Sequence, residues 1–142
     1  MQIIIPGEPL AQARMRLFTR HGISRVYDPQ SREKKHIVNH VKRLYNGPLL
    51  EHPCISFIFH MPIPNGITKK VLPLYISGCM RHEKKPDIDN LIKLYLDCID
   101  NICFKGDQKV SLGPCLKLYH PEPKTIIIIE ESDLTLCLSA IE

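Results

Sequence analysis

Two aspartates, Asp87 and Asp89, stand one residue apart at the expected start of a helix, just after Lys85-Pro86. Proline disfavours helical backbone at Lys85, so the chain should arrive extended and turn into the helix between the two aspartates. One aspartate is enough to cap the helix amides and suit the helix dipole, whereas a second adds like-charge repulsion. Paired carboxylates can also hold Mg²⁺, whose remaining ligands are commonly water and substrate phosphate.

A lysine and a third acid extend this pattern. Lys93 lies one helical turn beyond Asp89, where its charge can hold a phosphate or neutralise developing negative charge. The simpler interpretation is an Asp89–Lys93 pair on the helix surface, worth about 0.3–0.5 kcal/mol. Asp107 follows the helix in a glycine-containing turn, which can bring it back towards Asp87. From spacing alone, a metal site and a capped helix with a solvated polar face both remain open.

Charge is distributed unevenly along the 142 residues, whose formal net charge is +4. Residues 1–50 hold nine Lys and Arg against three acids, whereas residues 51–142 hold ten against twelve. Six of the fifteen acids fall between Glu83 and Asp107. The basic region can grip a polyanion that the acidic cluster would otherwise repel. The basic residues available to hold such a polyanion are Arg14, Arg16 and Arg20 in that region, and Lys69, Lys70, Arg81, Lys84 and Lys85 ahead of the acids.

The composition excludes several classes of protein. With 44% hydrophobic and 24% charged residues, the chain is neither disordered nor collagen-like. It contains no apolar run of about 20 residues, the length that spans a membrane. The N-terminal segment lacks the basic and apolar regions of a signal peptide, so we expect a cytoplasmic protein.

The pattern of apolar residues predicts one α+β domain over residues 1–142, with one mixed β-sheet and two main helices. Residues 126–129 are four consecutive isoleucines, which predict a central strand buried on both faces. Residues 7–30 are expected to form a loop, and residues 62–85 a loop with a short helical turn near 69–75. The expected helices cover residues 31–46 and 89–102; the expected strands cover 2–5, 54–61, 110–119 and 125–130, with an edge strand at 134–138.

The acidic helix start resembles the core motif of RusA-type Holliday junction resolvases, through Lys85-Pro-Asp87-Ile-Asp89-Asn90-Leu91-Ile-Lys93, then Asp97 and Phe104-Lys-Gly-Asp107. The opening of the chain is also similar to that family, through Ile5-Pro-Gly7-Glu-Pro9, Arg14-Met-Arg16 and Tyr27-Asp-Pro29. The resemblance implies a RusA-like fold and a Mg²⁺-dependent endonuclease, with Mn²⁺ as a substitute. It further implies a homodimer that cleaves four-way junction DNA symmetrically during recombination and repair.

The resemblance also assigns roles to residues. It implies that Asp87, Asp89 and Asp107 hold the metal and that Lys93 is catalytic with them. Asn90 matches the asparagine of the motif, and we expect it and Asp97 to support the metal ligands from behind. Two positions depart from the family pattern. Gly106 replaces the first of two aspartates after the helix, and Gln12 stands where lysine is common.

Two other functions remain compatible with the sequence. One is a nuclease of broader branched-DNA specificity. The other is a non-catalytic protein that recognises DNA structure, in which the aspartates only cap the helix. Cleavage of a synthetic junction separates these alternatives from a resolvase.

Overall fold

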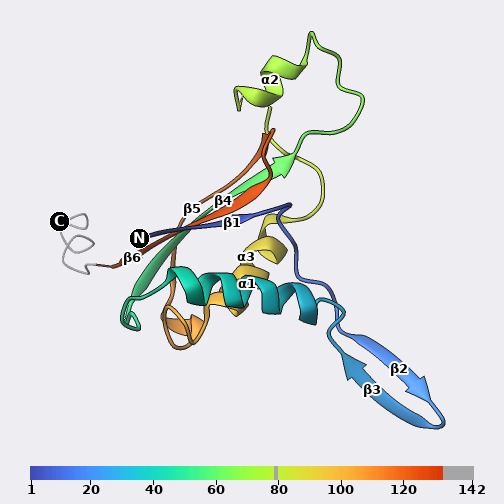
Figure 1. Ribbon diagram of the computed structural model, residues 1–142, viewed down its shortest axis with the longest axis vertical. Helices are drawn as coiled ribbons and strands as arrows, with labels where there is room; N and C mark the ends of the chain where they lie inside the picture. The colour runs from blue at the N-terminus through green and yellow to red at the C-terminus, as the bar shows by residue number, and fades with distance from the viewer. Residues whose placement is uncertain (79, 133–142) are drawn as a thin grey trace, which may run out of the picture.

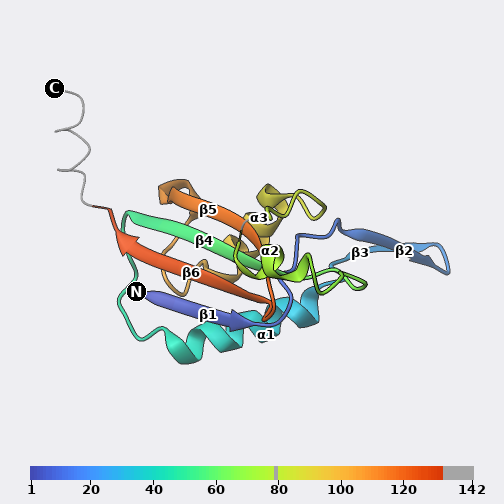
Figure 2. The same ribbon diagram turned by 90° about the horizontal axis from the view of Figure 1, so that it is seen from above.

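A computed structural model describes residues 1–78 and 80–132, which are built on a four-stranded mixed sheet (Figures 1 and 2). The order across the sheet is β1 (Gln2–Pro6), β6 (Lys124–Glu131), β4 (Pro53–Pro62) and β5 (Ser111–His120). Strand β6 pairs antiparallel with both of its neighbours, and β5 pairs parallel with β4. The parallel pair requires a crossover between its strands, and a helix supplies it.

Two helices, α1 (Ser31–Leu44) and α3 (Ile88–Ile99), lie on the same side of the sheet (Figure 1). The chain also forms a short helix α2 (Leu72–Ile76) and a 3-10 turn η1 (Asp107–Lys109). The predicted α+β domain with one mixed sheet and two main helices is therefore confirmed. Both helices end two to three residues earlier than predicted, because the backbone becomes extended at Tyr45 and Asp100.

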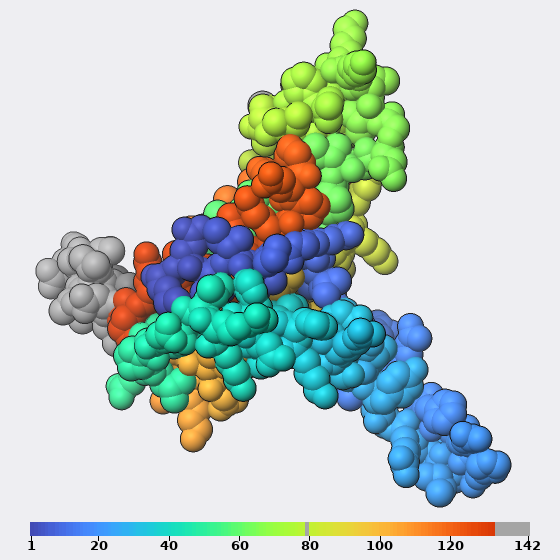
Figure 3. Space-filling model, in the orientation of Figure 1, coloured from blue at the N-terminus to red at the C-terminus, as the bar shows by residue number. Residues whose placement is uncertain are grey.

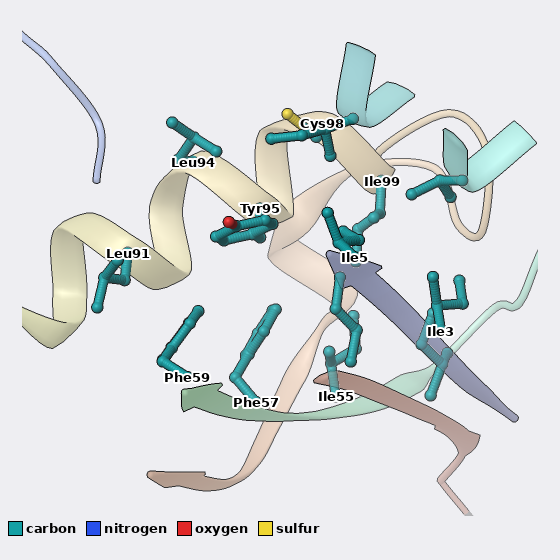
Figure 4. Packing of buried hydrophobic residues seen from close by; sticks show 14 of the residues in the cluster. Ile3, Ile5, Ile55, Phe57, Phe59, Leu91, Leu94, Tyr95, Cys98 and Ile99 are labelled. Atoms are coloured by element: carbon teal, nitrogen blue, oxygen red, sulfur yellow. The ribbon is translucent and has the colours of Figure 1, made fainter. Parts of the chain in front are cut away.

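The hydrophobic core fills the space between the helices and the sheet (Figure 4). Phe57 and Phe59 alternate onto the helix side of β4, where their rings stack with centroids 5.6 Å apart. Tyr95 of α3 packs on Phe59 at 5.7 Å. Burying the apolar stripe of α3 leaves its opposite side in solvent, and this is the side that carries Asp89 and Lys93.

The isoleucine run forms the central strand β6, as predicted. The prediction that this strand is buried on both faces was wrong. Ile127 and Ile129 are fully buried beneath the helices, whereas Ile126 and Ile128 are half-buried. The reason is that α1 and α3 cover only one face of the sheet. The strand predicted at 134–138 lies outside the described residues.

Residues 16–27 form a β-hairpin, so the loop predicted for residues 7–30 was wrong there. Strands β2 (Arg16–Arg20) and β3 (Ile23–Tyr27) pair antiparallel and project from the body of the molecule (Figures 1 and 3). His21 and Gly22 connect them with positive φ angles of 50° and 77°, as in the tight turns that match strand twist.

In the described ranges no helix is long and apolar enough to cross a membrane.

Candidate active site

Helix α3 begins at the first two predicted acids, Asp87 and Asp89. Asp87 is the N-cap residue, with extended backbone (φ −71°, ψ 146°), and Ile88 is the first helical residue. Asp87 and Asp89 are both exposed. Within the described chain, no side-chain hydrogen bond caps this end of α3. Helix capping therefore does not account for Asp87.

One polar face of α3 meets the turn that follows the helix. Asp89, Lys93 and Asp97 lie on successive turns and line a hollow of about 290 Å³. Asp107 lines the same hollow, whereas Asp87, towards which the sequence predicted its return, lines a different one. Among residues 1–78 and 80–132, Lys93 forms no ion pair with Asp89. The helix-pair interpretation of Lys93 is thus not supported.

Asp100 organises the turn that brings Asp107 back. Its Oδ1 accepts hydrogen bonds from the backbone N–H groups of Asn101 and Gly106, both at 2.9 Å. Phe104, which is fully buried, anchors the middle of the turn. No pattern in the sequence pointed to this role of Asp100.

Gly106 occupies a backbone conformation that explains its departure from the family pattern. Its φ of +86° and ψ of 121° are strained for residues with a Cβ atom. A Cβ atom there would also lie 2.6 Å from the side-chain amide of Gln108. This turn is therefore built for glycine, and an aspartate at this position requires a different backbone.

A larger hollow of about 840 Å³ lies on the other side of Asp89, and Asp87 and Arg81 line it. Lys117 of β5 reaches this hollow from below the loop. Its Nζ donates hydrogen bonds to the carbonyl oxygens of Lys84, at 2.8 Å, and Pro86, at 2.7 Å. Lys117 thereby ties the loop before Asp87 to the sheet. A single lysine within a strand gave no signal of this role in the sequence.

His82 lines the same hollow as Asp87 and Asp89. Its ring packs against Tyr119 with centroids 4.7 Å apart. Burial lowers the pKa of His82, and the nearby charge of Lys117 lowers it further. The ring is therefore neutral at physiological pH and adds no positive charge beside the acids.

The N-terminal segment is fixed to the start of α3. The backbone N–H of Gln12 donates to the carbonyl oxygen of Asn90 at 2.9 Å, and that of Leu10 donates to the hydroxyl of Tyr95 at 3.2 Å. The structure thus assigns Asn90, through its backbone, to holding the segment that leads into the hairpin. The side chain of Asn90 is half-buried.

Comparison with known proteins decides the family. The family model described as endodeoxyribonuclease RusA matches residues 6–130. The chain belongs to the RusA endodeoxyribonuclease family. It is also 28% identical over 140 residues to the uncharacterized protein YqaN of Bacillus subtilis (strain 168), covering 92% of this chain and 96% of YqaN. The matched range contains the opening loop, the hairpin, all three aspartates and Lys117.

The carboxylates of this RusA-family chain are ligands that divalent cations prefer, but in the described residues they do not form one cluster. Asp87, Asp89 and Asp107 offer exposed carboxylates along two hollows that share Asp89. In the part of the chain that the structure describes, no three possible ligands are grouped closely enough to hold an ion. Mg²⁺ needs only one or two carboxylates when water and phosphate complete its shell. A Mg²⁺ ion at these residues would therefore need water and substrate phosphate as most of its ligands.

The predicted DNA-contacting residues of the RusA-family chain occur in three places. Arg14, Arg16 and Arg20 lie at the base of the hairpin and along it, Lys69 and Lys70 precede α2, and Arg81, Lys84 and Lys85 precede Asp87. All eight side chains are exposed, and Arg81 also lines the larger hollow. The hairpin, α2 and the start of α3 lie towards the same end of the sheet, where β1 and β4 end (Figure 2). The predicted DNA-contacting residues thus belong to segments at the same end of the sheet as the start of α3.

Proposed function

We propose that this chain is a Mg²⁺-dependent endonuclease that resolves Holliday junctions by paired symmetric cleavage in DNA recombination and repair. The observation that supports it best is the exposure of the family's acids around the uncapped start of α3. Asp89 and Lys93 lie on an exposed helix face and line one hollow together with Asp107. Exposed carboxylates leave oxygen ligands free for Mg²⁺, and an exposed lysine is free to meet a phosphate.

The proposed reaction is hydrolysis of a phosphodiester. A water oxygen attacks the phosphorus, the bond from phosphorus to the 3′ oxygen breaks, and the leaving oxygen takes up a proton. A Mg²⁺ ion, or Mn²⁺ in its place, would lower the pKa of the water and polarise the phosphate. In this proposal Asp87, Asp89 and Asp107 hold the metal. Lys93 stabilises the charge that develops on the phosphate oxygens, and Asp97 supports the metal ligands from the next turns of the helix.

The basic residues bring the polyanion to this acidic site. Contacts from arginine and lysine to phosphates supply affinity and salt dependence without reading the bases. We therefore expect junction recognition mainly by shape. The contacts are assigned to the exposed residues around the hollows: Arg14, Arg16, Arg20, Lys69, Lys70, Arg81, Lys84 and Lys85.

A homodimer follows from the symmetry of the proposed reaction. A four-way junction is roughly two-fold symmetric, and resolution requires one cut in each of two opposed strands. Two copies related by a two-fold axis present two equivalent active sites to those strands.

The test compares substrates that share one sequence. Purified protein is incubated with Mg²⁺ and either a four-way junction, a flap, a fork or a linear duplex, and the cut sites on each strand are mapped. The proposal predicts paired nicks at symmetric positions of the junction, and none when EDTA removes the metal. Scattered cuts on flaps and forks indicate a broader nuclease, and binding without any cut overturns the enzymatic proposal.

A further inference from the structure

The β2–β3 hairpin has two chemically different faces. In an antiparallel pair, directly opposite residues share a face and successive residues alternate between faces. The pairs Arg16–Tyr27, Phe18–Arg25 and Arg20–Ile23 therefore lie on one face, which we call the cationic face. The other face carries the pairs Leu17–Val26 and Thr19–Ser24, and the two hydroxyls of the second pair are 3.0 Å apart.

The hairpin exposes apolar side chains that ordinarily need a partner. Five large apolar residues between Leu17 and Tyr27 are 45% to 67% exposed. Every residue of both strands is exposed. The space-filling view shows the hairpin as a separate lobe away from the sheet (Figure 3). An isolated two-stranded hairpin is only marginally stable in water, so a binding partner is expected to cover it.

The charge of the segment selects a polyanion as that partner. Between Glu8 and Asp28 the sequence has four arginines and no acid. Arg16, Arg20 and Arg25 all stand on the cationic face, interleaved with Phe18 and Tyr27. Aromatic rings alternating with guanidinium groups are the arrangement that binds nucleic-acid bases by stacking while holding the adjoining phosphates.

The cationic face also has a concave region at its tip. A hollow of about 350 Å³ is lined by Phe18, Arg20, His21, Ile23 and Arg25. Stacking requires a base whose face is free, which a paired base inside a duplex does not offer. The hollow therefore fits an unpaired or unstacked base better than an intact double helix.

The base of the hairpin is held in a fixed relation to the acids. The side chain of Gln30 bridges its two ends, donating to the Ala11 carbonyl at 2.8 Å and accepting from the Ala13 N–H at 2.7 Å. Between these residues, Gln12 is bonded to Asn90, the neighbour of Asp89. A strand end bound by the hairpin is thus held at a set position relative to the active-site helix.

We propose that the hairpin is a DNA-binding arm, in which Phe18 stacks on a base unpaired at the branch point and the three arginines hold the flanking phosphates. The assignment of the base to a branch point rests on the proposed function. The proposed affinity of the arm for unpaired bases does not depend on the proposed function.

The test measures binding to three DNA probes. A four-way junction and a single-stranded oligonucleotide each carry 2-aminopurine at one site, and a linear duplex serves for comparison. Phe18→Ala is paired with Leu17→Ala, because Leu17 is an adjacent exposed apolar residue on the other face. We expect Phe18→Ala to weaken binding of the junction and the single strand by about fivefold to a hundredfold, the range for losing one stacked base. It should also abolish the fluorescence change of 2-aminopurine and leave duplex affinity within twofold.

Leu17→Ala should bind all three probes like the wild type, and Phe18→Trp should keep the affinity of the wild type because it retains a stacking ring. Unchanged binding by Phe18→Ala overturns the proposal. An equal loss in Leu17→Ala also overturns it, since that result indicates that the hairpin fold, and not a stacking ring, determines the affinity. If the wild type does not cut the junction, the proposed function fails, while the single-strand comparison still tests the arm.

Discussion

Lys117 Nζ donates a hydrogen bond of 2.7 Å to the carbonyl oxygen of Pro86, the residue that precedes Asp87. A second bond of 2.8 Å joins the same ammonium group to the carbonyl oxygen of Lys84. Strand β5 therefore holds the loop from which α3 starts, and it fixes the direction from which Asp87 enters the hollow. Lys117 is a positioning residue in this account, because its ammonium group acts on the acids through the backbone.

Replacing Lys117 by methionine removes both bonds and keeps much of the side-chain volume. We expect a loss of about 1.5 kcal/mol in the free energy of unfolding, the scale for a hydrogen bond to a charged group. The Mg²⁺ concentration for half-maximal junction cleavage should rise severalfold, because Asp87 is no longer held. Urea unfolding and a Mg²⁺ titration of the cleavage rate measure the two effects.

The matched control is Lys35→Met, which removes an exposed lysine from α1. It should leave the Mg²⁺ requirement unchanged. Lys117→Arg retains a donor and should recover part of the wild-type requirement. If Lys117→Met cleaves with the wild-type Mg²⁺ dependence, Lys117 does not position Asp87.

Asp100→Ala removes the acceptor that closes the turn before Asp107. Two backbone N–H groups, of Asn101 and Gly106, lose their partner, which should cost about 1–2 kcal/mol of stability. Cleavage should fall further than stability explains, because Asp107 is no longer directed to the hollow beside Asp89. Rates measured well below the melting temperature separate the two effects, and a wild-type rate there would contradict the role of the turn.

Gly106→Asp restores the residue type common in the family, yet we expect it to harm this chain. The φ of +86° is strained for aspartate and costs about 1–3 kcal/mol. Removing the neighbouring side chain with Gln108→Ala relieves the close contact but leaves φ unchanged, so the double variant should stay destabilised. A thermal melt shows the effect, and a more stable Gly106→Asp protein would be inconsistent with the turn described above.

Stability should decrease in mildly acidic solution because of His60. Its ring stacks on that of His120 with centroids 4.1 Å apart; burial lowers the pKa of His60, and His120 and Lys124 lower it further. The unfolded chain therefore binds a proton more readily, so this contribution is complete above pH of about 6.5 and is lost as the pH falls. The urea midpoint should be lower at pH 5.5 than at pH 7.5.

The variant His60→Gln tests the source of that pH dependence. It should reduce the difference between the two midpoints, although His82, whose pKa is also lowered, retains part of it. An identical pH dependence in variant and wild type would assign the effect elsewhere.

Periodicity predicted most of the fold because burial against a sheet leaves a regular trace. Ile55, Phe57 and Phe59 alternate along β4, and the apolar stripe of α3 begins at Leu91. The hairpin escaped prediction because none of its residues is buried. The signal that could have found it is the pair His21-Gly22 between two five-residue segments rich in strand-forming residues.

For a similar reason, the sequence predicted the helix-face residues of the candidate site and missed the contact that holds the loop before Asp87. The spacing of Asp89, Lys93 and Asp97 on one helix face is a local property, and the structure confirms that they share one hollow with Asp107. The contact from Lys117 to Pro86 joins residues 31 positions apart and depends on which strand lies beneath the loop. Local periodicity carries no information on such a contact.

The central claim is most directly tested by mapping cuts on a four-way junction in Mg²⁺ with the wild type and three single variants. We expect paired symmetric nicks from the wild type, and junction binding without cleavage from Asp87→Asn, Asp89→Asn and Asp107→Asn. Glu51→Gln, an exposed acid outside both hollows, should cut like the wild type. A wild-type protein that binds the junction without cutting it, or any of the three aspartate variants cutting at the wild-type rate, would contradict the account.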